Sequence, residues 1–214
     1  MNSVYVYCEL EGTKVAEVSQ ELLTKGRKLA NTLGVKLEAV AAGSGITGKV
    51  EDQIIPYGVD KLHIFDAEGL SPYTTKPHTA VLVNLFKQEQ PQICLMGADV
   101  VGRDLGPRVS SALHSGLTAD CTSLEIGPHD DKKLGKHYDS LLYQIRPAFG
   151  GNIMAQIITP NTRPQFCYRL SALLRMSPYF SPVSLSCSIL RMPALSVCNL
   201  KKHRWNREIS TISE

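Results

Sequence analysis

Two hydrophobic periodicities alternate along the first half of the chain. Short apolar runs, typical of buried strands, are separated by longer stretches in which apolar residues recur every three or four positions, typical of amphipathic helices. The expected strands are residues 3–8, 35–42, 61–66 and 92–97. The expected helices follow them at residues 14–33, 50–56, 77–86 and 105–114. This alternation predicts an α/β fold with helices on both faces of a mainly parallel, twisted sheet.

The first of these helices has the clearest pattern. Thr13 is a suitable N-cap, and Gly34 stands where a helix commonly ends on a left-handed glycine. The apolar residues between them recur at spacings that place them on one face: Val15, Val18, Leu22, Leu29 and Leu33.

The rhythm changes after Gly116. Three strand-like runs follow without an intervening helix, at residues 119–126, 138–146 and 153–159, and residues 128–135 form a polar loop between the first two. Consecutive strands with short connections pair in an antiparallel manner. We therefore expect the sheet to end in antiparallel or mixed strands.

Composition and charge narrow the possible functions only slightly. Hydrophobic residues make up 43% of the chain and charged residues 20%, which is ordinary for a globular protein. Residues 1–165 contain 16 lysines and arginines against 18 aspartates and glutamates, whereas residues 166–214 contain 7 against 2. The net charge of +3 does not indicate a nucleic-acid partner.

The chain shows no sign of secretion or membrane insertion. No apolar stretch approaches the length of a transmembrane helix, and no signal peptide precedes the first strand. Cys8, Cys94 and Cys121 lie singly in apolar runs, without a CxxC pair that would suggest a metal or redox site. Buried thiols of this kind fit the reducing cytoplasm.

One glycine-rich segment has the position of a ligand-binding loop. Gly97 ends an expected strand, and Gly102, Arg103 and Arg108 follow before and within the next helix. Ligands of doubly wound folds bind at the carboxyl ends of strands, where glycines and helix amides can approach a phosphate. These four residues are therefore the candidate cofactor contacts.

Two other interpretations of that segment remain open. Its spacing matches neither the dinucleotide fingerprint nor a P-loop. Asp104 and the two arginines could instead form internal ion pairs within a capped turn. The segment could also contact another subunit.

A second segment, residues 146–152, contains a Gly-Gly-Asn turn between two strands. It is either a simple hairpin or bend, or a surface on which Arg146, Phe149 and Asn152 face a partner. No residue indicates catalysis: the serines after Gly102 lack a nucleophile elbow, and no histidines have metal-ligand spacing. We expect neither a catalytic site nor a metal.

Three stretches of the chain resemble the N-terminal domain of electron transfer flavoprotein alpha subunits. The longest is residues 95–126, LMGADVVGRDLGPRVSSALHSGLTADCTSLEI. Residues 145–165, IRPAFGGNIMAQIITPNTRPQ, resemble the segment that follows it in the family. The opening strand and residues 17–34, EVSQELLTKGRKLANTLG, fit as well. The resemblance covers residues 1–165.

This resemblance implies an α/β domain of the adenine-nucleotide alpha-hydrolase type, paired with an electron transfer flavoprotein beta subunit. The family's heterodimer carries electrons from flavin dehydrogenases to an acceptor and is a carrier rather than a catalyst. Its FAD is held mainly by the C-terminal domain of the alpha subunit. The resemblance therefore implies a scaffold role for residues 1–165, with no FAD on this chain alone.

The resemblance stops after Gln165. The family continues with Met or Phe and then Ala-Thr-Val, whereas this chain continues Phe166-Cys167-Tyr168-Arg169. The last 49 residues contain no glycine, although all 16 glycines occur before them. The codons TTT TGC TAC CGT encode Phe-Cys-Tyr-Arg, and deletion of one T restores Phe-Ala-Thr and the start of Val. We therefore expect residues 166–214 to be an out-of-frame, disordered tail; a genuine variant tail or a basic interaction arm is the alternative.

Two other functions occur in this fold group, and the sequence bears on both. A stand-alone adenine-nucleotide-binding module of the universal-stress type would use the loop from Gly97 to Gly102. An ATP-pyrophosphatase needs a serine- and glycine-rich phosphate loop after the first strand, and residues 9–13, Glu-Leu-Glu-Gly-Thr, exclude it.

Overall fold

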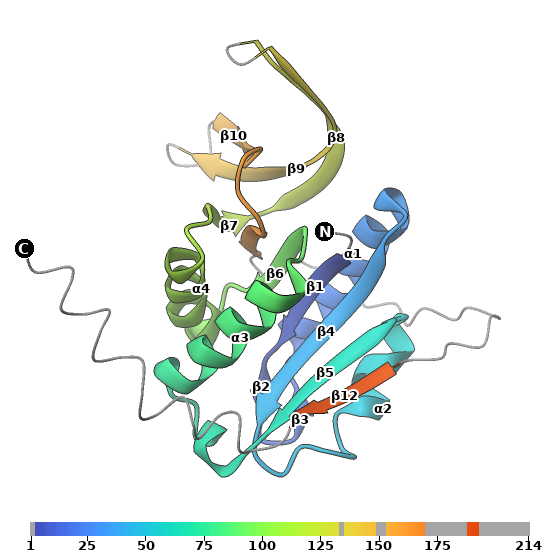
Figure 1. Ribbon diagram of the computed structural model, residues 1–214, viewed down its shortest axis with the longest axis vertical. Coiled ribbons are helices and arrows are strands. Elements are labelled where there is room, and N and C mark those ends of the chain that lie inside the picture. The colour runs from blue at the N-terminus through green and yellow to red at the C-terminus, as the bar shows by residue number, and fades with distance from the viewer. Residues whose placement is uncertain (1–2, 133–134, 149–152, 170–187, 193–214) are drawn as a thin grey trace, which may run out of the picture.

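A seven-stranded parallel sheet forms the centre of the molecule (Figure 1). The computed structural model describes residues 3–132, 135–148, 153–169 and 188–192. The strands lie in the order β12-β5-β4-β1-β6-β11-β7, and each neighbouring pair is parallel. Their bounds are β1 Ser3–Cys8, β4 Lys36–Gly43, β5 Lys61–Asp66, β6 Ile93–Gly97, β7 Leu117–Cys121, β11 Gln165–Arg169 and β12 Ser188–Met192. The predicted α/β fold is confirmed.

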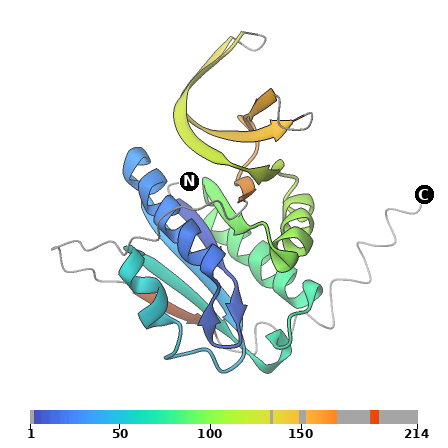
Figure 2. The same ribbon diagram turned by 180° about the vertical axis from the view of Figure 1, so that it is seen from behind.

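Helices cover both faces of this sheet, as the sequence predicts. The helices are α1 Glu17–Leu33, α2 Glu51–Ile54, α3 Thr75–Glu89 and α4 Val100–Ala112, with short 3-10 turns at Ile55–Tyr57 and Glu68–Leu70. Figure 1 shows α3 and α4 in front of the sheet, and Figure 2 shows α1 and α2 on the opposite face. Strand β1 is buried throughout, so its alternate side chains enter two cores: Val4 and Val6 on the α1 side, Tyr5 and Tyr7 on the α3 side.

The predicted antiparallel strands form a separate sheet instead of the end of the main one. Strands β8 Ser123–Asp131, β9 Lys136–Ala148 and β10 Ile153–Ile157 pair in the order β10-β9-β8. They project beyond the main sheet as a curved arm (Figures 1 and 2). The run expected at residues 119–126 is split, because β7 returns to the parallel sheet while β8 begins the arm.

The ends of α1 match the sequence prediction at one terminus only. Gly34 has a φ of 66° and its amide bonds to the carbonyls of Ala30 and Asn31, as expected for a glycine C-cap. The N-cap is Ala16 and not Thr13. The chain around Thr13 forms a small hairpin instead, between β2 Leu10–Glu11 and β3 Lys14–Val15.

Helix α4 begins at Val100, five residues before the predicted start at Leu105. Asp99 is its N-cap, and a side-chain hydrogen bond from the Gly102 amide to Asp99 closes the first turn. Pro107 therefore lies inside the helix and not in its first turn.

Strand β11 crosses the position at which the domain was expected to end. It spans Gln165–Arg169 between β6 and β7, and Phe166 and Cys167 are fully buried. The expected boundary after Gln165 thus falls inside a strand, because the sheet requires one to join β6 to β7. Farther on, the backbone of β12 pairs with β5. Segments 170–187 and 193–214, where disorder was predicted, lie outside the described residues.

Candidate functional site

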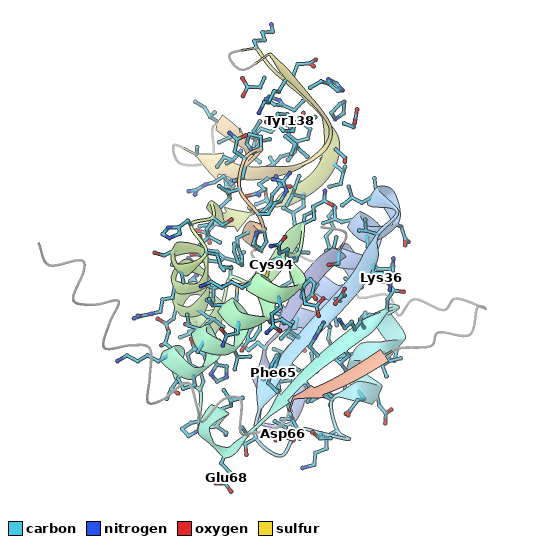
Figure 3. All side chains as sticks on the ribbon, viewed as in Figure 1. Lys36, Phe65, Asp66, Glu68, Cys94 and Tyr138 are labelled. Atoms are coloured by element: carbon cyan, nitrogen blue, oxygen red, sulfur yellow. The ribbon has the colours of Figure 1, made fainter. Side chains whose placement is uncertain are left out.

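The carboxyl ends of the parallel strands are the natural place to look for a ligand in this fold. Three acidic residues stand at this edge: Glu9 follows β1, Asp66 ends β5, and Asp99 follows β6. Figure 3 shows Asp66 at the lower end of the sheet, near Glu68. The chemistry of this edge depends on whether its amide and arginine donors are free to receive an anion.

The glycine-rich turn before α4 satisfies one amide of the first turn of the helix. The Oδ1 atom of Asp99 accepts the backbone N–H of Gly102 at 2.8 Å. A Cβ atom on Gly102 would lie 1.9 Å from the carbonyl oxygen of Gly97, so only glycine fits there. The two glycines therefore serve a tight turn capped by a carboxylate, which occupies the place an anionic ligand would take at the helix N-terminus.

Arg103 is held by groups of the protein itself. Its Nη2 atom lies 2.7 Å from Oδ1 of Asp120, and its Nε atom donates to the carbonyl of Ala98 at 2.9 Å. Arg108 lies one turn further along α4, with its Nε atom 3.4 Å from Oδ1 of Asp104. Both predicted cofactor-binding arginines are thus paired with carboxylates.

Asp104 is also tied to the loop before α3. It accepts hydrogen bonds from the Tyr73 hydroxyl at 2.9 Å and from the Thr75 hydroxyl. The bond from Thr75, followed by that from Tyr73, lowers the pKa of Asp104. Burial, together with the neighbouring Asp104, raises the pKa of Tyr73 to about 12. Asp104 therefore joins α4 to the segment that leads into α3.

Glu9 adds a second acidic side chain beside the same turn. Burial, a hydrogen bond with Asp99 and the charge of Asp99 together raise the pKa of Glu9 to about 9. Glu9 is therefore held in its protonated form at neutral pH. A phosphate placed here would lie beside two acidic side chains, and the neighbouring arginines already have carboxylate partners.

The other glycine-containing loop, residues 43–48, is occupied in the same way. Asp66 accepts the amides of Gly45, Ile46 and Thr47 at 2.7, 3.0 and 2.9 Å, and the Thr47 hydroxyl at 2.7 Å. Burial alone would raise the pKa of Asp66, but these hydrogen bonds outweigh it and the pKa is lowered. The loop amides that could surround a phosphate instead surround this carboxylate.

The arrangement does not fit a nucleotide or flavin phosphate. Gly97, Gly102, Arg103 and Arg108 do come together at the start of α4, but Gly102, Arg103 and Arg108 each have a carboxylate partner within the chain. In the described part of the chain, no group of three or more His, Cys, Asp or Glu side chains could hold a metal. Among the described helices, none is long and apolar enough to cross a membrane.

A buried polar cluster that the sequence did not reveal lies under α3. The Tyr5 hydroxyl donates to Oε2 of Glu38 at 2.5 Å, and the Nε2 atom of His63 lies 2.7 Å from the same oxygen. Burial would raise the pKa of Glu38, but the bonds from His63 and Tyr5 outweigh it and lower that pKa. Each residue sits in an apolar strand and is separated from the others by many positions, so no local motif marks the cluster.

The arm places the second predicted segment away from the start of α4. Arg146 lies on β9 opposite Ala155 of β10 and is partly buried, while Phe149 and Asn152 lie outside the described residues. Ile153 and Met154, which follow this segment and were not among the predicted interface residues, are 54% and 55% exposed. Successive residues of a strand point to opposite faces, so β10 exposes apolar side chains on both faces of the arm.

A family model and individual relatives both match most of this chain. The model of the electron transfer flavoprotein domain matches residues 4–168. LctC, a subunit of lactate dehydrogenase (NAD(+),ferredoxin) from Acetobacterium woodii, is 43% identical over 164 residues, which cover 77% of this chain and 37% of the relative. The electron transfer flavoprotein subunit alpha of Megasphaera elsdenii is 41% identical over 162 residues, covering 76% of this chain and 45% of that protein.

A further relative matches a longer part of the chain. The acryloyl-CoA reductase electron transfer subunit beta of Anaerotignum propionicum is 32% identical over 206 residues, covering 87% of this chain and 54% of that protein. This chain spans between 37% and 54% of the length of the three relatives. The match to residues 4–168 includes the whole arm. It also includes every strand of the main sheet other than β12, apart from the end residues Ser3 and Arg169. The chain belongs to the electron transfer flavoprotein family.

Proposed function

We propose that this chain provides the N-terminal scaffold domain of an electron transfer flavoprotein alpha subunit. The match of the family domain to residues 4–168 carries this proposal, because it includes both the glycine-rich turn before α4 and the arm. In this role the domain supports a heterodimer that passes electrons from flavin dehydrogenases to an acceptor. It is part of a carrier and performs no catalytic step itself.

FAD belongs, in this proposal, to the intact heterodimer and not to this chain alone. The internal pairing of Gly102 with Asp99, Arg103 with Asp120 and Arg108 with Asp104 supports a structural role for the candidate cofactor residues. The purified chain should therefore be colourless. Stoichiometric yellow flavin on the chain alone would contradict this.

The arm is the proposed contact with the beta subunit. Ile153 and Met154 expose apolar surface on both faces of β10, and Arg146 lies on the neighbouring strand. The adjacent Phe149 and Asn152 complete the interface in this proposal. Buried thiols at Cys8, Cys94, Cys121 and Cys167 agree with a cytoplasmic location, because reduced cysteines persist there.

Binding of the cognate beta subunit tests the proposal. The purified chain should form a stoichiometric complex in analytical ultracentrifugation, and Met154→Glu should weaken it by placing a charge in an apolar contact. Val100→Glu is the matched control, because Val100 is 86% exposed and lies on α4 and not on the arm. Equal effects of the two substitutions, or no complex with the unaltered chain, would contradict the proposed interface.

The stand-alone nucleotide module is not supported, since the Gly102 amide and Arg103, at the end of its loop, are already paired with Asp99 and Asp120. Titration of the chain with AMP and ATP distinguishes the two functions. Micromolar binding without a beta subunit would favour the nucleotide module, and the scaffold proposal expects none.

A further inference from the structure

A concavity lies between the arm and the end of the main sheet at which β6 begins. It is lined by residues 137–141 of β9, by Gln92 before β6, and by Arg163, and its volume is about 360 Å³. Figure 3 shows Tyr138 in the arm, above the main sheet. Small-molecule sites are commonly concave spaces of about 300 Å³ or more. The size and the polar lining are therefore suited to a small polar ligand.

Arg163 is the charged group of this concavity. Its Nη1 atom donates to the carbonyls of Thr159, Pro160 and Thr162 at 3.0, 3.1 and 2.9 Å. These neutral contacts fix the guanidinium but do not balance its charge. The Arg163 side chain is partly buried, and this burial lowers its pKa.

No carboxylate compensates Arg163 in the described part of the chain. The ion pairs there involve Arg27, Arg103 and Arg108 but not this arginine. Among the described residues, its Nε and Nη2 atoms have no hydrogen-bond acceptor. A guanidinium presents its N–H groups as a planar fork that matches the two oxygens of a carboxylate or phosphate. The unused donors of Arg163 therefore fit an oxyanion.

The wall opposite Arg163 carries charges of both signs. His137 is bound by Asp130 at 2.5 Å and by Asp139 at 3.3 Å, and the bond with Asp130 is the main cause of its raised pKa. One imidazolium offsets only one of these two carboxylates, so an anion is favoured on the Arg163 side of the concavity. Gln92 and Ser140 add polar groups to the lining.

We propose that this concavity binds a small oxyanion, either a carboxylate or a phosphate group, with Arg163 as its main ligand. The site is separate from the carboxyl edge of the sheet and does not depend on the scaffold function. The bound anion supplies the counter-charge that Arg163 lacks within the described chain.

Calorimetric titration of the purified full chain with inorganic phosphate and with acetate tests the proposal. Acetamide is the neutral control for acetate, and ionic strength is held constant. At least one anion should bind saturably, and the anion with the lower dissociation constant identifies the ligand class. Arg163→Gln should weaken binding at least about tenfold, as expected for loss of a charge-assisted hydrogen bond. Lys28→Gln removes the same charge from an exposed position of α1 and should change nothing.

Two substitutions of opposite charge at Ser140 keep the test decisive if Arg163→Gln does not fold. Ser140 is exposed, so substitutions there should leave the fold intact. Ser140→Asp should weaken anion binding and Ser140→Lys should strengthen it, because both place a charge in the wall of the concavity. Absence of saturable binding to both anions, equal affinity of the two Ser140 variants, or equal losses in Arg163→Gln and Lys28→Gln would overturn the proposal.

Discussion

The α-carbon of Gly102 faces the carbonyl oxygen of Gly97 so closely that a Cβ atom would lie 1.9 Å from it. Gly97 ends β6, and Gly102 lies in the first turn of α4. The contact therefore fixes how the helix leaves the sheet. A segment that resembles a ligand loop in the sequence has a steric purpose in the fold.

Gly102→Ala should accordingly be strongly destabilising. The added methyl group would have to displace backbone, and overpacking costs about 1–3 kcal/mol and occasionally more, so a value near the upper end is expected here. Urea unfolding followed by circular dichroism measures the change. Ser111→Ala, at an exposed position of the same helix, is the control and should lie within about 0.5 kcal/mol of the unaltered chain. A similar stability for both variants would mean that the turn can relax.

Glu9 should make the stability of the domain fall as the pH rises. Its folded-state pKa of about 9 exceeds the ordinary value of 4.5 for a glutamate, so between these values the folded chain holds a proton that the unfolded chain has released. The associated stability is complete below about pH 4.5 and is lost as the pH rises towards 9. Glu9→Gln should remove this dependence, and unfolding measurements at pH 5, 7 and 9 test it.

The matched control for Glu9 is Glu11→Gln, two residues along the chain and exposed. It makes the same chemical change, and Glu11 contributes least to the raised pKa of Glu9, so it should largely preserve the slope of stability against pH. If Glu9→Gln and Glu11→Gln give the same slope, the proton held by Glu9 is not its source.

Asp66→Ala should loosen the loop at residues 43–48. The variant removes four hydrogen bonds to a carboxylate and leaves the amides of Gly45, Ile46 and Thr47 to water. A loss of about 2 kcal/mol is expected, because the site is partly exposed and water replaces some of these bonds. Amide hydrogen exchange should accelerate in the loop. Glu68→Ala, an exposed acidic neighbour, is the control and should leave exchange unchanged.

The sequence predicted the parallel sheet because its strands are buried on both faces. Val4, Tyr5 and Val6 form a continuous apolar run, which distinguishes such a strand from the alternating pattern of an exposed sheet. Gly34 was equally predictable, because a left-handed helix end is a local property of the chain.

The start of α4 could not be predicted in the same way. Gly102, Gly106 and Pro107 have poor intrinsic helix propensity and favour a loop. Tertiary contacts reverse this preference: a Cβ atom on Gly106 would lie 2.8 Å from the Tyr168 ring, so the glycine lets the helix approach β11. Such packing depends on residues far along the chain. The core cluster of Tyr5, Glu38 and His63 escaped prediction for the same reason.

Strand β11 escaped prediction for a different reason. The 49 residues after Gln165 have a composition unlike that of the preceding chain, and this difference masks the short apolar run from Phe166 to Tyr168. A chain shortened to residues 1–169 should fold, whereas one shortened to residues 1–165 should not. Loss of three buried side chains from the centre of the sheet costs on the order of 5 kcal/mol, comparable with the stability of a whole domain. Circular dichroism and thermal unfolding of the two chains measure the difference.

The coding sequence after Gln165 provides the last prediction. We propose that residues 166–214 are read out of frame, because one deleted T converts codons for Phe166-Cys167-Tyr168-Arg169 into the family's Phe-Ala-Thr-Val. The strand β11 is compatible with this, since Phe166 is retained and Cys167 and Tyr168 are themselves suited to a buried strand. One observation opposes it: the match to the acryloyl-CoA reductase subunit covers 87% of this chain and so extends past β11. Sequencing of the gene decides between them. A neighbouring frame that continues into a flavin domain supports the proposal, and its absence in all frames would show that residues 166–214 are a genuine part of this chain.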